Sequence, residues 1–292
     1  MFETIRRGWG LTKLSFSVIK QDKELMLFPV FSGIVMVVLM ASFGGFGWWM
    51  DHTTGLNDQA ALALGLVFYF LSYLVVIYFN TGVVFAARIR LDGGDPTLKD
   101  GFRGANSRLP QIFGWALIAA TVGLILQILQ RMARDRNNLI GQILAGLAGM
   151  AWNLMTYFVL PIIAAEGLGP IDSIKKSASV FKRTWGESIV GGLGIGLIFF
   201  LLGVLGVIPL FIAYSIGNAT LLIAVFALVV LYWVFLAILN STASQVLVAT
   251  LYRYATKGET GGVMPPDAAQ HIFDRQQNWD RYTEPSGRIR NA

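Results

Sequence analysis

Residues 221–252 read LLIAVFALVVLYWVFLAILNSTASQVLVATLY and contain no Asp, Glu, Lys, Arg or His. An α-helix needs about 20 apolar residues to cross the hydrocarbon layer of a bilayer, and this stretch exceeds that length. Backbone polar groups find no water in hydrocarbon, so a helix that satisfies its own hydrogen bonds is the form such a stretch adopts. The stretch therefore predicts a transmembrane helix.

Five further windows predict spans of the same kind, at residues 25–50, 60–87, 111–130, 139–165 and 189–216. Apolar residues make up 55% of the chain and charged residues 14%, whereas a soluble domain carries about 25% charged residues. The sequence thus predicts an all-α integral membrane protein, a bundle of six transmembrane helices. Window 111–130 is only just long enough, so a re-entrant third span is an open alternative.

Lysines and arginines gather on one side of the predicted spans. All but three of the 23 fall in the N-terminal segment, in the loops after spans two and four, and in the tail. The exceptions are Arg131, Arg134 and Arg136, which lie between spans three and four. Cytoplasmic loops carry an excess of Lys and Arg, so both termini are predicted to be cytoplasmic. Residues 1–256 are the predicted membrane domain and 257–292 a flexible polar tail.

Three segments on the basic side carry apolar residues at helical spacing with basic residues between them: residues 2–20, 96–109 and 170–187. Asp95 is expected to cap the second segment, with Pro96 in its first turn. Each segment precedes two predicted spans. The chain is therefore predicted to consist of three tandem units, each an amphipathic interfacial helix plus a helical hairpin.

A basic amphipathic helix beside a bilayer lies at the interface, with its cations near lipid phosphates. Such helices form either a collar that anchors the bundle or a surface that binds anionic lipid, and both interpretations are open. The candidate anionic-lipid contacts are Arg6, Arg7, Lys99, Arg103, Arg108, Lys175, Lys176, Lys182 and Arg183.

Uncharged polar residues occur within the predicted spans, mostly in the second span of each unit. No charged residue or histidine lies well inside a span, which counts against proton coupling. The polar side chains form either interhelical hydrogen bonds or the lining of a path for a solute or ion. The candidate lining residues are Asn80, Thr81, Asn153, Thr156, Asn240, Thr242 and Gln245.

The sequence predicts no catalytic residues, no cofactor and no metal site. It has no cysteine, and its two histidines, His52 and His271, fall on opposite sides of the predicted membrane. The net charge of +6 does not indicate a nucleic-acid partner, because the basic residues flank apolar spans. Only Asp92, Asp95 and Glu166 are candidates for an enzyme that acts on lipid headgroups.

Three segments at the predicted cytoplasmic helix junctions are similar to those of a known group: DGGDP at 92–96, SVFKRTWGE at 179–187 and LYRYATKGE at 251–259. The chain resembles, over roughly residues 1–260, an uncharacterised family of polytopic prokaryotic membrane proteins. The resemblance implies a bacterial or archaeal cytoplasmic-membrane protein. It implies no reaction, substrate or active site.

The leading functional expectation is a non-enzymatic membrane scaffold or lipid-interacting protein. Its expected partners are anionic membrane lipids, and a second copy or another membrane protein. A channel or facilitator for a small solute or ion is the alternative, and a lipid-headgroup enzyme is a weaker one.

Overall fold

The computed structural model describes residues 13, 15–55, 57–135 and 139–257, and every element in this part of the chain is helical. After helical residues 13 and 15–21, the elements are η1 (Lys23–Met26), α2 (Leu27–Thr54), α3 (Asp58–Leu91), α4 (Leu98–Asn106), α5 (Leu109–Asp135), α6 (Leu139–Met155), α7 (Val159–Glu166), α8 (Pro170–Leu205), α9 (Ile208–Ile216) and α10 (Ala219–Lys257). Most of the predicted helix 2–20 and nearly all of the predicted tail lie outside the described residues.

Six helical stretches are long and apolar enough to cross a membrane: Lys23–Thr54, Asp58–Leu91, Leu109–Arg134, Leu139–Glu166, Gly192–Ile216 and Ala219–Lys257. The predictions of an all-helical protein and of six candidate spans are thereby confirmed, and the chain fits a multi-pass membrane protein. α5 is a continuous helix of 27 residues, which corresponds to about 40 Å at 1.5 Å per residue. That length suffices for a full crossing.

The fourth span is broken near a proline. α6 and α7 are separated at residues 156–158, ahead of Pro161, which has no backbone N–H and whose ring clashes with the carbonyl four residues earlier. The buried hydroxyl of Ser177 in α8 accepts the backbone N–H of Phe158 at 2.9 Å. A neighbouring helix thus satisfies a donor that the break leaves outside the helical ladder.

The fifth span is broken in the same way, at Gly206 and Val207, ahead of Pro209. Two side chains of α10 donate to carbonyls beside this break. The hydroxyl of Tyr232 donates to Leu202 O at 2.8 Å, and the indole N–H of Trp233 donates to Gly203 O at 3.1 Å. α10 is therefore the partner that stabilises the bend between α8 and α9.

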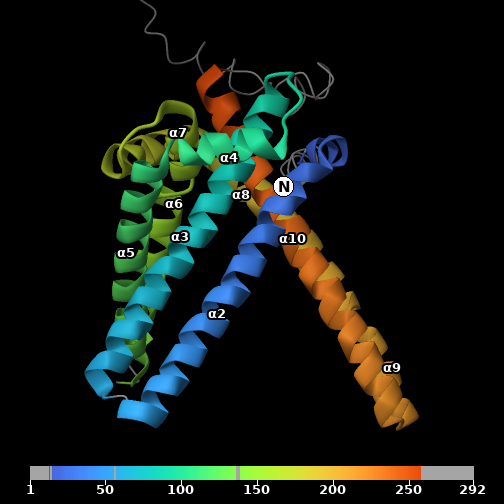
Figure 1. The fold of residues 1–292 in the computed structure, drawn as a ribbon. Helices are drawn as coiled ribbons and strands as arrows, with labels where there is room; N and C mark the ends of the chain where they lie inside the picture. Colours follow the sequence, from blue (N-terminus) through green and yellow to red (C-terminus); the bar gives the residue numbers. More distant parts are fainter. Residues whose placement is uncertain (1–12, 14, 56, 136–138, 258–292) are drawn as a thin grey trace, which may run out of the picture.

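The helices converge at one end of the molecule and diverge at the other (Figure 1). The converging end holds α4, α7, the start of α8 and the end of α10, and we call it the basic end because most described lysines and arginines belong to its segments. The opposite, hairpin end holds the turns that join α2 to α3 and α9 to α10. Toward the hairpin end, α9 and α10 form a leg that separates from α2, α3, α5 and α6.

The largest packed core lies toward the basic end. Phe28, at the start of α2, is 1% exposed and packs against α3 and α4. A Cβ atom added at Gly82 would lie 2.7 Å from the Phe28 ring, and one at Gly101 would lie 2.3 Å from it. These two glycines therefore let one phenylalanine join three helices. Buried side chains from α7, α8 and α10 complete the cluster.

Large apolar side chains remain exposed along α8, α9 and α10 beyond this core, among them Phe200, Phe211 and Leu231. A helix that is apolar on all faces is stable only in apolar surroundings. The exposed surface of the leg therefore fits contact with lipid.

α4 packs on the other helices through its apolar residues. Leu98 and Phe102 contact the main core, and Ala105 is fully buried. The predicted cap at Asp95 is wrong, because the N-cap is Thr97, whose hydroxyl accepts the N–H of Asp100 in a reciprocal capping box. A Thr cap with an acidic residue three positions later satisfies two helix-start N–H groups, which an Asp cap alone would not.

Asp95 instead accepts a hydrogen bond from Arg90, which also pairs with Asp22. Glu24 accepts the backbone N–H of Leu98 at 2.9 Å. These contacts attach the segment before α2 to the junction between α3 and α4.

The predicted interfacial segment 170–187 and the first part of the fifth span belong to one helix, α8, whose N-cap is Gly169 and whose first turn holds Pro170. Thr184 lies inside α8 with non-helical angles, φ −120° and ψ 18°. The expected boundary between the two segments is therefore a bend near Thr184.

Candidate functional site

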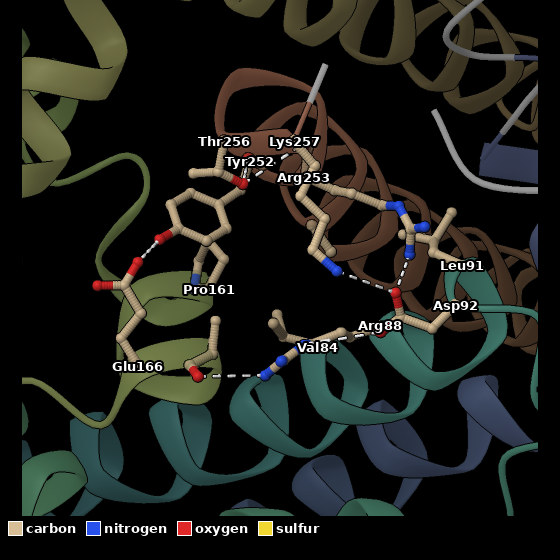
Figure 2. A pocket seen from close by; sticks show the side chains of 12 residues that line it. Val84, Arg88, Leu91, Asp92, Pro161, Glu166, Tyr252, Arg253, Thr256 and Lys257 are labelled. Atoms are coloured by element: carbon tan, nitrogen blue, oxygen red, sulfur yellow. Dashed lines mark hydrogen bonds and ion pairs between the residues drawn. The ribbon is translucent and has the colours of Figure 1, made fainter. Parts of the chain in front are cut away.

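A cavity of about 230 Å³ lies at the basic end, between the ends of α3, α7 and α10. Charged and hydroxyl side chains form its rim, and aliphatic side chains form its wall. We call it the basic-end cavity, and it is lined by Val84, Arg88, Leu91, Asp92, Pro161, Ala165, Glu166, Ala249, Tyr252, Arg253, Thr256 and Lys257. Figure 2 shows these side chains around a common space.

The two acidic residues of the rim occupy equivalent junctions. Asp92 follows the last residue of α3 and Glu166 is the last residue of α7, and each precedes a glycine with positive φ, 87° at Gly93 and 67° at Gly167. Glycine adopts this conformation without steric cost and ends a helix there. A carboxylate at a helix C-terminus opposes the helix dipole, so both junctions require nearby cations.

Three cations lie near the Asp92 carboxylate. Arg253 of α10 donates a hydrogen bond to it, Lys257 Nζ lies 3.5 Å from Oδ1, and Arg88 Nε lies 3.9 Å from Oδ2. Arg88 also donates to the carbonyls of Ala164 and Ala165, at 3.5 and 3.3 Å. Arg88 thus links the end of α3 to the end of α7.

Glu166 has two partners. Lys176 Nζ of α8 lies 2.5 Å from Oε2, and the hydroxyl of Tyr252 of α10 donates to Oε1. Tyr252 and Arg253 are consecutive in the chain, yet they contact carboxylates on two different helices (Figure 2). One turn of α10 therefore joins the ends of the second and fourth spans.

The candidate lipid contacts take several positions in the structure. Lys99 and Arg103 of α4 and Lys175 and Lys182 of α8 are exposed. Lys176 is half-buried in the ion pair with Glu166.

Arg108 is half-buried, and its guanidinium would lie 2.4 Å from a Cβ added at Gly167. Arg6, Arg7 and the side chain of Arg183 lie outside what the structure describes.

The seven candidate lining residues do not line the basic-end cavity. The hydroxyls of Thr81, Thr156 and Thr242 each donate to a carbonyl one turn earlier in their own chain segment, at 2.7, 2.8 and 2.9 Å. Asn153 is exposed, whereas Asn80, Asn240 and Gln245 are half-buried. The structure therefore distributes these residues over separate environments.

Sequence reasoning favoured a membrane-flanking role for Arg88 over a place in a phosphate-handling loop with Asp92, and it assigned no site role to Tyr252, Arg253 or Lys257. The sequence did contain a signal for this site. An acidic residue followed directly by glycine, with a proline four positions after the acid, occurs twice, as DGGDP at 92–96 and EGLGP at 166–170. The equivalence of these junctions predicts that their carboxylates lie at one end of the bundle. The pairing with α10 required the three-dimensional structure.

Within the described ranges, no group of three or more His, Cys, Asp or Glu side chains could hold a metal ion. The basic-end cavity instead offers cations, two carboxylates and hydroxyl groups beside an apolar wall.

Comparison with known proteins identifies one family, described as a family of unknown function (DUF6159), whose sequence profile matches residues 59–262. The chain belongs to this family. The match begins after the first span and includes the whole basic-end cavity. A search of the curated proteins found no match.

Proposed function

We propose that this member of the DUF6159 family is a non-enzymatic protein of the prokaryotic cytoplasmic membrane that interacts with anionic lipids. In this proposal the basic end faces the cytoplasm, and the fold consists of three tandem units of an amphipathic segment and a hairpin. The repeated acid–glycine–proline junction supports the tandem arrangement, and the distribution of lysines and arginines supports the orientation.

One observation carries the proposal. Four exposed cations, Lys99 and Arg103 of α4 and Lys175 and Lys182 of α8, belong to segments that join membrane-spanning helices at the basic end. Cations at that depth meet the phosphate region of a bilayer, where each contributes about 1 kcal/mol toward an anionic surface. The apolar residues of α4 pack on protein, which leaves its cations directed away from the core.

A channel has less support, because the hydroxyls of three candidate lining residues bond within their own chain segment. An enzyme has less support too, although Asp92 and Glu166 do line one cavity. Ion pairs already engage both carboxylates, Asp92 with Arg253 and Glu166 with Lys176.

The test is the lipid that co-purifies with the protein. The variant Lys99→Gln/Arg103→Gln/Lys175→Gln/Lys182→Gln is extracted from membranes containing phosphatidylglycerol and phosphatidylethanolamine, and the bound ratio is measured by mass spectrometry. We expect the phosphatidylglycerol fraction to fall. The matched control, Arg131→Gln/Arg134→Gln, removes exposed cations at the hairpin end and should leave the ratio unchanged. Equal ratios for both variants and the wild type would overturn the proposal.

The orientation has its own test, which the absence of cysteine simplifies. Ser107→Cys and Asn218→Cys place single thiols at exposed positions in the α4–α5 turn and the α9–α10 turn. A membrane-impermeant maleimide added to intact cells should label the second thiol alone. Labelling of Ser107→Cys under these conditions contradicts a cytoplasmic basic end.

A further inference from the structure

We infer that the basic-end cavity is a binding site for a phosphate group, carried by a lipid headgroup or by a soluble phosphate ester. Its assignment to lipid rests on the function proposed above, whereas its preference for phosphate rests on the cavity alone.

The first argument is the charge around Asp92. The cavity lining holds three cations and two carboxylates. Glu166 is paired with Lys176, which lies outside the lining. The three lining cations, Arg253, Lys257 and Arg88, therefore share Asp92, each within 4 Å, which leaves two positive charges in excess. Like charges held together in a partly enclosed cavity repel one another unless an anion joins them. A phosphate carries one or two negative charges and offers several acceptor oxygens to such a cluster.

The second argument is access. The side chains of Arg88 and Lys257 are 43% and 54% exposed, whereas that of Arg253 is 14% exposed. Arg253 therefore holds Asp92 in place, while Arg88 and Lys257 are the cations that an entering anion reaches. The Lys257–Asp92 distance of 3.5 Å is longer than a tight charge-assisted hydrogen bond, so an anion competes easily for this ammonium group.

The third argument is the wall of the cavity, which contains Val84, Leu91, Pro161, Ala165 and Ala249. These residues belong to helices that continue into the membrane-spanning region. A ligand with a charged head and an apolar body matches cations at the rim and aliphatic side chains below them. This arrangement favours a phospholipid over a free anion as the source of the phosphate.

The fourth argument is size. The volume of about 230 Å³ compares with about 30 Å³ for a water molecule in the liquid. Space equivalent to several waters accommodates a phosphate group with part of a glycerol backbone.

The experiment measures binding of two probes to the full-length protein in a neutral detergent. Phosphatidylglycerol is added and the 1:1 adduct is quantified by native mass spectrometry, and inorganic phosphate is titrated while thermal unfolding is followed. Lys257→Glu reverses a rim charge at the exposed end of α10. Lys20→Glu reverses an exposed charge outside the cavity and serves as the control.

We expect phosphatidylglycerol to bind the wild type and Lys20→Glu alike, and to bind Lys257→Glu at least about tenfold more weakly, because a charge-assisted contact is replaced by repulsion. If inorganic phosphate binds with the same dependence on Lys257 and the lipid does not, the site is for a soluble phosphate ester. Equal binding of both probes to Lys257→Glu and Lys20→Glu overturns the proposal, as does binding of neither probe to the wild type.

Melting temperatures of the variants report whether each has folded, and Lys257→Gln repeats the comparison with a milder change. The four exposed cations of the proposed lipid surface are intact in Lys257→Glu. Failure of the cavity site is therefore distinguishable from failure of the general lipid interaction, which the co-purified lipid ratio measures.

Discussion

Replacing Tyr252 by Phe removes one hydroxyl and tests whether α10 is joined to α7 through Glu166. The Tyr252 ring is buried, so the substitution changes no packing apart from the lost oxygen. A hydrogen bond to a charged group contributes about 1.5–3 kcal/mol. Because the Glu166 side chain is 30% exposed, water can replace part of the lost bond, and we expect a loss of about 1.5 kcal/mol in the free energy of unfolding.

The measurement is reversible unfolding in mixed micelles of neutral detergent and dodecyl sulfate, followed by circular dichroism. Tyr232→Phe is the matched control, because this hydroxyl donates to a neutral carbonyl, Leu202 O, at 2.8 Å. A neutral hydrogen bond contributes about 1 kcal/mol, so the control should cost less than Tyr252→Phe.

A double-mutant cycle assigns the loss to the pair. In a Glu166→Ala background the Tyr252 hydroxyl has lost its acceptor, so Tyr252→Phe should become nearly neutral, with a coupling free energy of about 1.5 kcal/mol. Tyr232→Phe should cost the same in both backgrounds. An undiminished cost of Tyr252→Phe after removal of Glu166 would refute the assigned link between α10 and α7.

Further substitutions test the junctions around the cavity. Gly167→Ala and Gly217→Ala should both lower the melting temperature, because both positions have positive φ, and Gly167→Ala should lower it slightly more, because the guanidinium end of Arg108 must also move aside for the Cβ. Ser177→Ala leaves a buried N–H in the fourth-span break without its acceptor, which should cost about 1–3 kcal/mol in the same unfolding assay. The hydrogen bond from Thr97 lowers the pKa of Asp100, so it stabilises the start of α4 at neutral pH and this contribution is lost as the pH falls through the lowered pKa. The protection factors of the α4 amides, which correct for the pH dependence of intrinsic exchange, should therefore fall on acidification, and Thr97→Ala should reduce that pH dependence.

The spans were predictable from sequence because their signal is local. The stretch 221–252 needs only its own composition to be assigned as a transmembrane helix, and α10 contains all of it. Helix boundaries were less predictable, because Thr97 and Asp95 are both acceptable caps, and only the structure shows that Arg90 engages Asp95 while Thr97 caps α4. The bend at Thr184 was also not predictable, because no proline lies beside it.

The basic-end cavity could not be predicted in full, because its contacts join residues that are far apart in the chain. Asp92 and Arg253 are separated by 161 positions, and Glu166 and Tyr252 by 86. Each residue alone has an ordinary role at a helix end, so composition and spacing give no reason to pair them. The lining role of the polar residues inside the spans stays a prediction, and the hydroxyls of Thr81, Thr156 and Thr242 bond to their own backbone, as threonine in a helix readily does.

The position of Tyr252 and Arg253 near the end of the last span has a consequence for biosynthesis. A ribosome delivers the chain from its N-terminus, so Asp92 and Glu166 emerge long before the side chains of α10 that bind them. During that interval Asp92 has Arg88 one turn away on α3, and Glu166 gains Lys176 once the start of α8 is translated. In this order of synthesis, each carboxylate has a cation nearby in the chain before α10 is translated and binds both of them.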